Sequence, residues 1–132
     1  MPAMIRFLLL ACGLALSAAG CMTATNAAVD NIVDGQSFAM QPGQQVTLPN
    51  RSRLHYVGVQ SDSRCQPGHQ CIWAGNALVG FKWEPAGGRT QAFELSTPQP
   101  PQSRDLGSLR LTLLSLAFGA APQVRLRVDR AP

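Results

Sequence analysis

Apolar and polar residues alternate along much of the chain. Within residues 77–84, alanine, valine, phenylalanine and tryptophan occupy every second position, while Lys82 and Glu84 belong to the other set. Residues 124–129 alternate as strictly between an aliphatic and a charged residue. Because successive side chains of a β-strand point to opposite faces, each segment is predicted to form a strand with one buried face.

Five more segments are short, rich in β-forming residues and bounded by turn residues. Turns are predicted at Pro42-Gly43 and at residues 49–52 and 85–88, and a proline-rich surface loop is predicted at residues 96–104. The additional strands are predicted at residues 37–40, 45–48, 54–60, 89–95 and 109–118. A set of about seven short strands favours an all-β domain, either a small antiparallel β-sandwich or a barrel.

The apolar run near the N-terminus has a different character. Residues 7–19 follow a short segment that carries one positive charge, and they have the length of a signal-peptide core, too short to span a bilayer permanently. The run closes with Leu-Ser-Ala-Ala-Gly-Cys at residues 16–21. Small residues followed by a cysteine resemble the lipobox of bacterial lipoproteins. Cys12 is no rival, because the apolar segment before it is too short.

This resemblance implies that the chain is cut after residue 20 and that Cys21 carries the lipid. The expected organisation is a signal peptide at residues 1–20, a lipidated and flexible tether at 21–34, and a β-sandwich domain at 35–132. Met22 occupies the position where an aspartate commonly retains lipoproteins at the inner membrane. The resemblance therefore implies a membrane partner through the lipid anchor, on the periplasmic face of the outer membrane of a Gram-negative bacterium.

Two cysteines in the middle of the chain allow two interpretations. Cys65 and Cys71 enclose Gln66, Pro67, Gly68, His69 and Gln70. An exported chain meets an oxidising compartment, and a Pro-Gly turn can bring two cysteines within bonding range, which favours a disulfide. Alternatively, Cys65, His69 and Cys71 supply three ligands for a soft metal, although no fourth ligand follows at zinc spacing. The disulfide is our expectation, without a metal or another cofactor.

The residues around this pair resemble a motif of known proteins. Ser63-Arg64-Cys65 and the run from Cys71 to Gly75, Cys-Ile-Trp-Ala-Gly, resemble the core of a group of small, uncharacterised bacterial secreted proteins and lipoproteins. In that group a proline directly follows the first cysteine, whereas Gln66 stands there in this chain. The resemblance implies fold and location, and no activity. Trp73 is predicted to pack as a lid on the disulfide and the core.

No catalytic or nucleic-acid site is readable in the remaining polar residues. The formal net charge is +4, but the basic residues are scattered and no run interleaves them with aromatic residues, so nucleic acid is not an expected partner. His55 has no acid or nucleophile tied to it by a motif. The same isolation applies to the carboxylates Asp62, Glu84, Glu94, Asp105 and Asp129. We therefore expect a protein that is not an enzyme.

These observations favour a lipid-anchored cell-envelope protein with a non-catalytic structural or interaction domain. Its candidate contact loop comprises residues 66–70 together with Trp73, and an envelope protein is its possible partner. Two alternatives stay open. One is a periplasmic metal- or copper-handling protein that uses Cys65, His69 and Cys71, with Met40 as a further ligand. The other is an inhibitor of a protease or lysozyme that presents residues 66–70.

Overall fold

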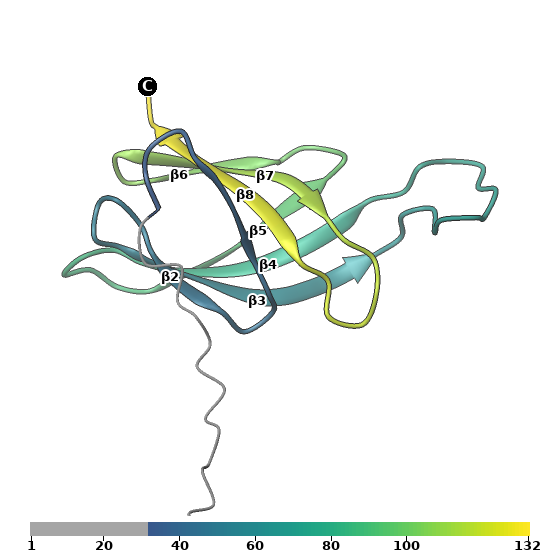
Figure 1. Ribbon diagram of the computed structural model, residues 1–132, viewed down its shortest axis with the longest axis horizontal. Coiled ribbons are helices and arrows are strands. Elements are labelled where there is room, and N and C mark those ends of the chain that lie inside the picture. Colours follow the sequence, from purple (N-terminus) through teal and green to yellow (C-terminus); the bar gives the residue numbers. More distant parts are fainter. Residues whose placement is uncertain (1–31) are drawn as a thin grey trace, which may run out of the picture.

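The computed structural model describes residues 32–132, which form two antiparallel sheets packed face to face (Figure 1). The strands are β1 (Ser37–Met40), β2 (Gln45–Thr47), β3 (Arg53–Asp62), β4 (Ala77–Glu84), β5 (Gln91–Thr97), β6 (Ser103–Leu106), β7 (Leu109–Leu116) and β8 (Val124–Arg130). One sheet has the order β1-β8-β7-β6, and the other has the order β2-β3-β4-β5. The predicted all-β class is confirmed, and the architecture is an open sandwich, because the sheets do not close into a barrel.

The core lies between the two sheets and follows the alternation in the sequence. Val124, Leu126 and Val128 of β8 are completely buried, while Arg125 and Arg127 between them are exposed. Aromatic rings from three neighbouring strands stack across the other sheet, with the centroids of Tyr56 and Phe81 5.6 Å apart and those of Phe81 and Phe93 5.5 Å apart. The alternating strands predicted from the sequence are thus confirmed.

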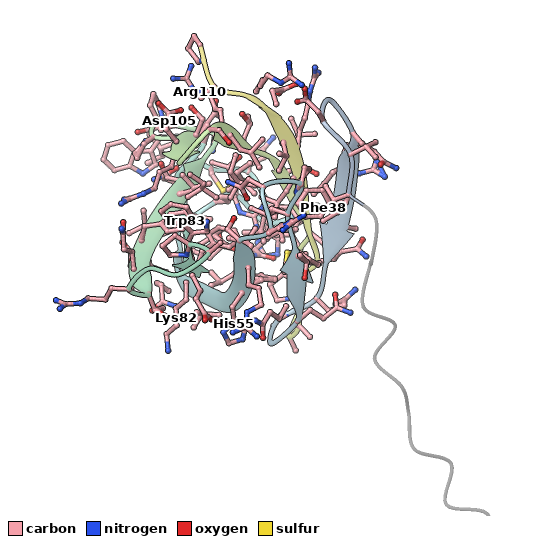
Figure 2. The ribbon with its side chains drawn as sticks, turned by 90° about the vertical axis from the view of Figure 1, so that its left-hand side faces the viewer. Phe38, His55, Lys82, Trp83, Asp105 and Arg110 are labelled. Carbon is pink, nitrogen blue, oxygen red and sulfur yellow. A yellow bond between two sulfur atoms is a disulfide. The ribbon has the colours of Figure 1, made fainter. Side chains whose placement is uncertain are left out.

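Figure 2 shows the two layers from the side. Trp83 points into the interior, whereas its strand neighbour Lys82 lies with His55 on the outer side of its sheet. Asp105 and Arg110 lie on the opposite outer side and form an ion pair with a separation of 2.7 Å. Charged side chains thus lie on both outer faces, and the apolar core lies between the sheets.

Strand β6 was missing from the sequence prediction, which assigned its first two residues to the proline-rich loop. Its residues Ser103–Leu106 pair with β7, and Leu106 is completely buried. Four residues with a single apolar side chain carry no alternation signal, so only the neighbouring strand reveals this one. The prediction also gave no pairing for the first two strands, and the structure places them in different sheets, β1 beside β8 and β2 beside β3.

The sandwich has two distinct ends, which we call proximal and distal. At the proximal end the described chain joins the fold: the Gly35 amide donates to the Val128 carbonyl at 2.7 Å, and Ile32 is 5% exposed within the core. Ile32, three residues before Gly35, where the domain was expected to start, is therefore already part of the core. At the distal end β3 and β4 continue into a long loop at residues 63–76, which projects to the right in Figure 1. The predicted signal peptide, Cys21 and most of the tether lie outside the described residues.

Candidate functional site

The two arms of the loop between β3 and β4 are joined to each other by hydrogen bonds. The Ser63 amide and hydroxyl donate to the Asn76 carbonyl at 2.8 and 2.9 Å, and the Asn76 amide donates back to the Ser63 hydroxyl at 3.0 Å. Further out, the Cys65 amide donates to the Ala74 carbonyl at 3.1 Å. Gly75 has a φ of +68°, and a Cβ there would collide with the Ser63 carbonyl, so the two arms meet closely only because this residue is glycine.

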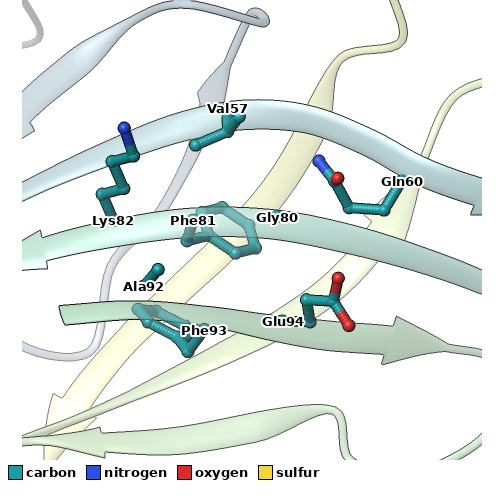
Figure 3. Close-up of a pocket in the computed structure, with 8 residues that line it drawn as sticks. All are labelled: Val57, Gln60, Gly80, Phe81, Lys82, Ala92, Phe93 and Glu94. Carbon is teal, nitrogen blue, oxygen red and sulfur yellow. The ribbon is translucent and has the colours of Figure 1, made fainter.

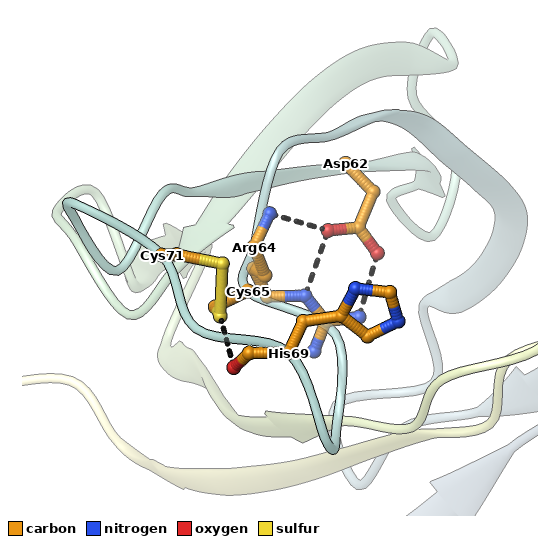
Figure 4. The surroundings of a disulfide bond; sticks show 5 residues. All are labelled: Asp62, Arg64, Cys65, His69 and Cys71. Carbon is orange, nitrogen blue, oxygen red and sulfur yellow. Dashed lines mark hydrogen bonds and ion pairs between the residues drawn. A yellow bond between two sulfur atoms is a disulfide. The ribbon is translucent and has the colours of Figure 1, made fainter.

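A disulfide between Cys65 and Cys71 closes the end of this loop (Figure 4). Their Cα atoms lie 5.8 Å apart, and the His69 amide donates to the Gln66 carbonyl across the Pro67-Gly68 turn. The predicted disulfide is confirmed. Because each sulfur is bonded to the other, neither is a thiolate for the alternative metal site. Residues 32–132 contain no other group of three or more potential metal ligands.

Arg64 fixes the loop to the body of the sandwich. Its guanidinium donates to both carboxylate oxygens of Asp62 at 2.9 and 2.7 Å, and it also donates to the carbonyls of Leu116 and Ala117 at 2.7 and 3.1 Å. Its carbon Cζ lies 4.0 Å from the ring centroid of Phe118. The side chain is only 10% exposed, and these acceptors satisfy it in the way a buried guanidinium requires.

Two pKa shifts accompany this attachment. The side-chain hydrogen bond from Arg64 lowers the pKa of Asp62. Burial raises the pKa of Tyr56 to about 12, and its hydroxyl donates to the Pro122 carbonyl at 2.7 Å. Arg64 and Tyr56 thus both hold the connection between β7 and β8, so these shifts report structural contacts.

The side chains at the end of the loop point into solvent. Ile72 is fully exposed and Trp73 is 83% exposed, and residues 66–70 are exposed as well. The prediction of Trp73 as a lid on the disulfide and core is therefore wrong. The indole instead lines a shallow surface depression with Ser63, Gly75, Asn76 and Gln99, outside the core. No Asp, Glu, Lys or Arg occurs from residue 65 to residue 76, a local signal that could have indicated an exposed contact surface.

The sequence analysis missed a shallow depression on the outer face of the β2-β3-β4-β5 sheet (Figure 3). It has a volume of about 360 Å³, with Gly80 and Ala92 on its floor and Lys82 and Glu94 near its two ends. Its lining comes from three strands, so no single segment of sequence predicts it. Nothing in its lining forms a nucleophile–base pair of the kind catalysis needs.

The carboxylates that stand alone in the sequence are mostly paired in the fold. Besides Asp62, the structure pairs Glu84 with Arg53, Asp105 with Arg110 and Asp129 with Arg127, at 2.7 to 2.9 Å. These are exposed or half-exposed pairs on the sheet faces. They explain the polar surface and supply no catalytic pair of carboxylates.

The fold and the loop define the class of this protein as a small, disulfide-bridged β-sandwich with a projecting apolar tip. The chain matches no protein-family model, no curated protein and no solved structure. Among residues 32–132 we find no helix long and apolar enough to cross a membrane.

Proposed function

We propose that this protein is a lipid-anchored envelope protein whose sandwich presents a rigid tip to a partner protein. We define the tip as residues 66–73. The apolar run that closes on Cys21 supports the anchor, placed on the periplasmic face of the outer membrane. The observation that carries the proposal is the exposure of Ile72 and Trp73, at 102% and 83%, on a braced loop.

Such exposure has a cost that folding alone does not explain. Burying one large apolar side chain is worth about 1.5–3 kcal/mol, yet the loop holds two of them away from the core. Tryptophan is among the residues that contribute most to binding at protein interfaces. The disulfide and the Ser63–Asn76 contacts order the loop before binding. Binding of a partner therefore costs less conformational entropy of this loop.

The tip also indicates what kind of surface it fits. Because the tip contains no Asp, Glu, Lys or Arg, a matching site is expected to be poor in charges, with an apolar region for Ile72 and Trp73. A narrow convex loop fits a cleft better than a flat surface. This shape favours one narrower function, an inhibitor that inserts residues 66–70 into the cleft of a protease or lysozyme.

The experiment is a crosslinking pull-down of the full acylated protein from its own envelope. Wild type is compared with Trp73→Ala and with Leu114→Ala, which removes an exposed apolar side chain from β7. We expect Trp73→Ala to lower recovery of the partner by about tenfold or more and Leu114→Ala to leave it unchanged. Equal recovery with all three proteins would overturn the tip as the contact. A captured hydrolase, inhibited by wild type and not by Trp73→Ala, would establish the narrower function.

A further inference from the structure

The proximal end of the sandwich has a charge pattern of its own. Four carboxylates lie on or near this end, and each is within 3.6 Å of an arginine: Asp34 with Arg130, Glu84 with Arg53, Asp105 with Arg110, and Asp129 with Arg127. Each pair is neutral as a unit. Any further cation at this end therefore adds uncompensated positive charge.

Besides Arg104 on β6, whose guanidinium donates to the Gln91 side chain at 3.4 Å, three such cations are present. Arg51 lies in the β2–β3 turn, Arg89 lies in the β4–β5 turn, and Lys82 lies on β4 close to its proximal end. All three are exposed, and none forms an ion pair within residues 32–132. The distal loop at residues 65–76 contains no Asp, Glu, Lys or Arg, so the two ends of the sandwich differ in charge.

Arg51 has an unusual backbone conformation in a turn that hydrogen bonds hold in place. Its φ is +65°, in the left-handed region that glycine or asparagine enters more easily. Its turn is nevertheless held tightly: the Arg51 amide donates to the Leu48 carbonyl at 2.9 Å, and Asn50 donates from its side chain to the Leu106 carbonyl at 3.1 Å. An arginine in this conformation on a fixed turn points to a role for its charge.

An apolar side chain accompanies these cations. Val33 is 57% exposed where the described chain joins the sandwich, next to the buried Ile32. Cations and an exposed aliphatic residue at the same end of a domain are a combination that binds the surface of an anionic bilayer, where the charges meet lipid phosphates and the apolar group enters the interface.

We propose that the proximal end, through Arg51, Arg89, Lys82 and Val33, docks on an anionic phospholipid surface. The charge complementarity selects this partner. The inference deepens the proposed function, because a lipid at Cys21 would hold this end beside the bilayer. Docking stands the sandwich on the membrane with its tip directed away from the lipid, where a protein partner can reach Trp73.

The test measures amide hydrogen exchange of the full acylated protein in vesicles of phosphatidylglycerol and phosphatidylcholine, and in vesicles of phosphatidylcholine alone. We expect the turns at residues 48–52 and 85–90 to exchange about threefold more slowly, or slower still, on the anionic vesicles at low salt. This protection should disappear at high salt, because salt screens the attraction. The tip at residues 66–73 should exchange at the same rate on both vesicles.

Two variants separate docking from folding. Arg51→Gly combined with Arg89→Gln removes two proximal cations and relaxes the φ of residue 51, so it should fold as well as wild type and lose the protection. The control is Arg125→Gln, which removes an exposed cation from the distal part of β8 and should retain the protection of the proximal turns. Equal protection in both variants would overturn the proposal.

The acyl group is measured in the same samples by intact mass. An acylated, vesicle-bound protein whose proximal turns exchange equally on both vesicles would overturn the docking face and leave the anchor in place. A protein without the acyl group whose turns are still protected by anionic vesicles would overturn the anchor and support the docking face. Protection of the tip in place of the proximal turns would contradict the proposed orientation.

Discussion

At the scale of single residues, Arg64 connects three parts of the molecule. It binds Asp62 at the end of β3, the carbonyls of Leu116 at the end of β7 and of Ala117 just after it, and the ring of Phe118. Its motif neighbours Ser63 and Cys65 bond to the opposite arm of the loop. Within the Ser-Arg-Cys sequence, Arg64 therefore attaches the loop to the sandwich, and Ser63 and Cys65 join the two arms of the loop.

Replacing Arg64 tests this connection. Arg64→Met keeps most of the side-chain volume but leaves Asp62 unpaired and the Leu116 and Ala117 carbonyls without their donor. We expect the free energy of unfolding to fall by about 2–4 kcal/mol in denaturant titrations. The exposed Arg125→Met is the control and should change it by less than about 0.5 kcal/mol. A similar small loss in both variants would show that Arg64 contributes no more than a surface residue.

Tyr56 gives a pH dependence with a definite sign. Burial raises its pKa from 10.0 to about 12, so the folded chain holds the hydroxyl proton more tightly than the unfolded chain does. The resulting stability is complete below pH 10 and is lost as pH rises towards about 12. Unfolding titrations across this range should show a steeper decline for wild type than for Tyr56→Phe. If the free energy of unfolding fell equally with pH in wild type and in Tyr56→Phe, the Tyr56 hydroxyl would not be the source of this pH dependence.

At the scale of structural elements, the disulfide and the sandwich are separate sources of order. The bridge closes a short loop, and the arms below it are already joined by Ser63 and Asn76. The bridge is therefore placed to order residues 66–70 more than the strands beneath them. This separation lets the tip be altered without dismantling the fold.

The double variant Cys65→Ser/Cys71→Ser tests this separation. We expect the free energy of unfolding to fall by about 2 kcal/mol, as loop-closure entropy gives for so short a loop. Amide exchange should become faster at residues 66–70 and remain slow in the buried strands β4 and β8. Equally accelerated exchange in β4 and β8 would show that the sandwich itself depends on the bridge.

At the scale of the whole molecule, the two ends differ in chemistry. Uncompensated cations gather at the proximal end, and exposed apolar side chains occupy the distal loop, at opposite ends of the long axis in Figure 1. A membrane at one end and a protein at the other would use both surfaces at once. The sandwich between them is then a rigid spacer.

The anchor itself has a direct test. Intact mass of the protein extracted from membranes should show a chain that begins at Cys21 and carries acyl groups. Cys21→Ser should lack both the acyl mass and the cut before residue 21, while Cys12→Ser should match wild type. An unacylated wild-type chain would remove the lipid anchor from the proposed function.

Part of the fold was predictable because its signals are local. Alternation marked β4, β8 and their buried faces, and runs of β-forming or apolar residues between turn signals marked five more of the eight strands, whereas β6 escaped because it has one apolar residue. The candidate loop was predicted from its two cysteines. The exposure of Trp73 was not, because whether an indole packs or projects depends on how the surrounding arms are held.

The sequence by itself determined the β class and the buried faces of β4 and β8, and it favoured the Cys65–Cys71 disulfide, since a period of two and a short spacing between cysteines are properties of neighbouring residues. Only the tertiary structure decided which groups Arg64 binds, that Trp73 projects beyond the body, and that the cations lie at the other end. The attachment of Arg64 to Leu116, for example, joins residues more than fifty positions apart in sequence. Distances of that kind are set by the packing of the two sheets.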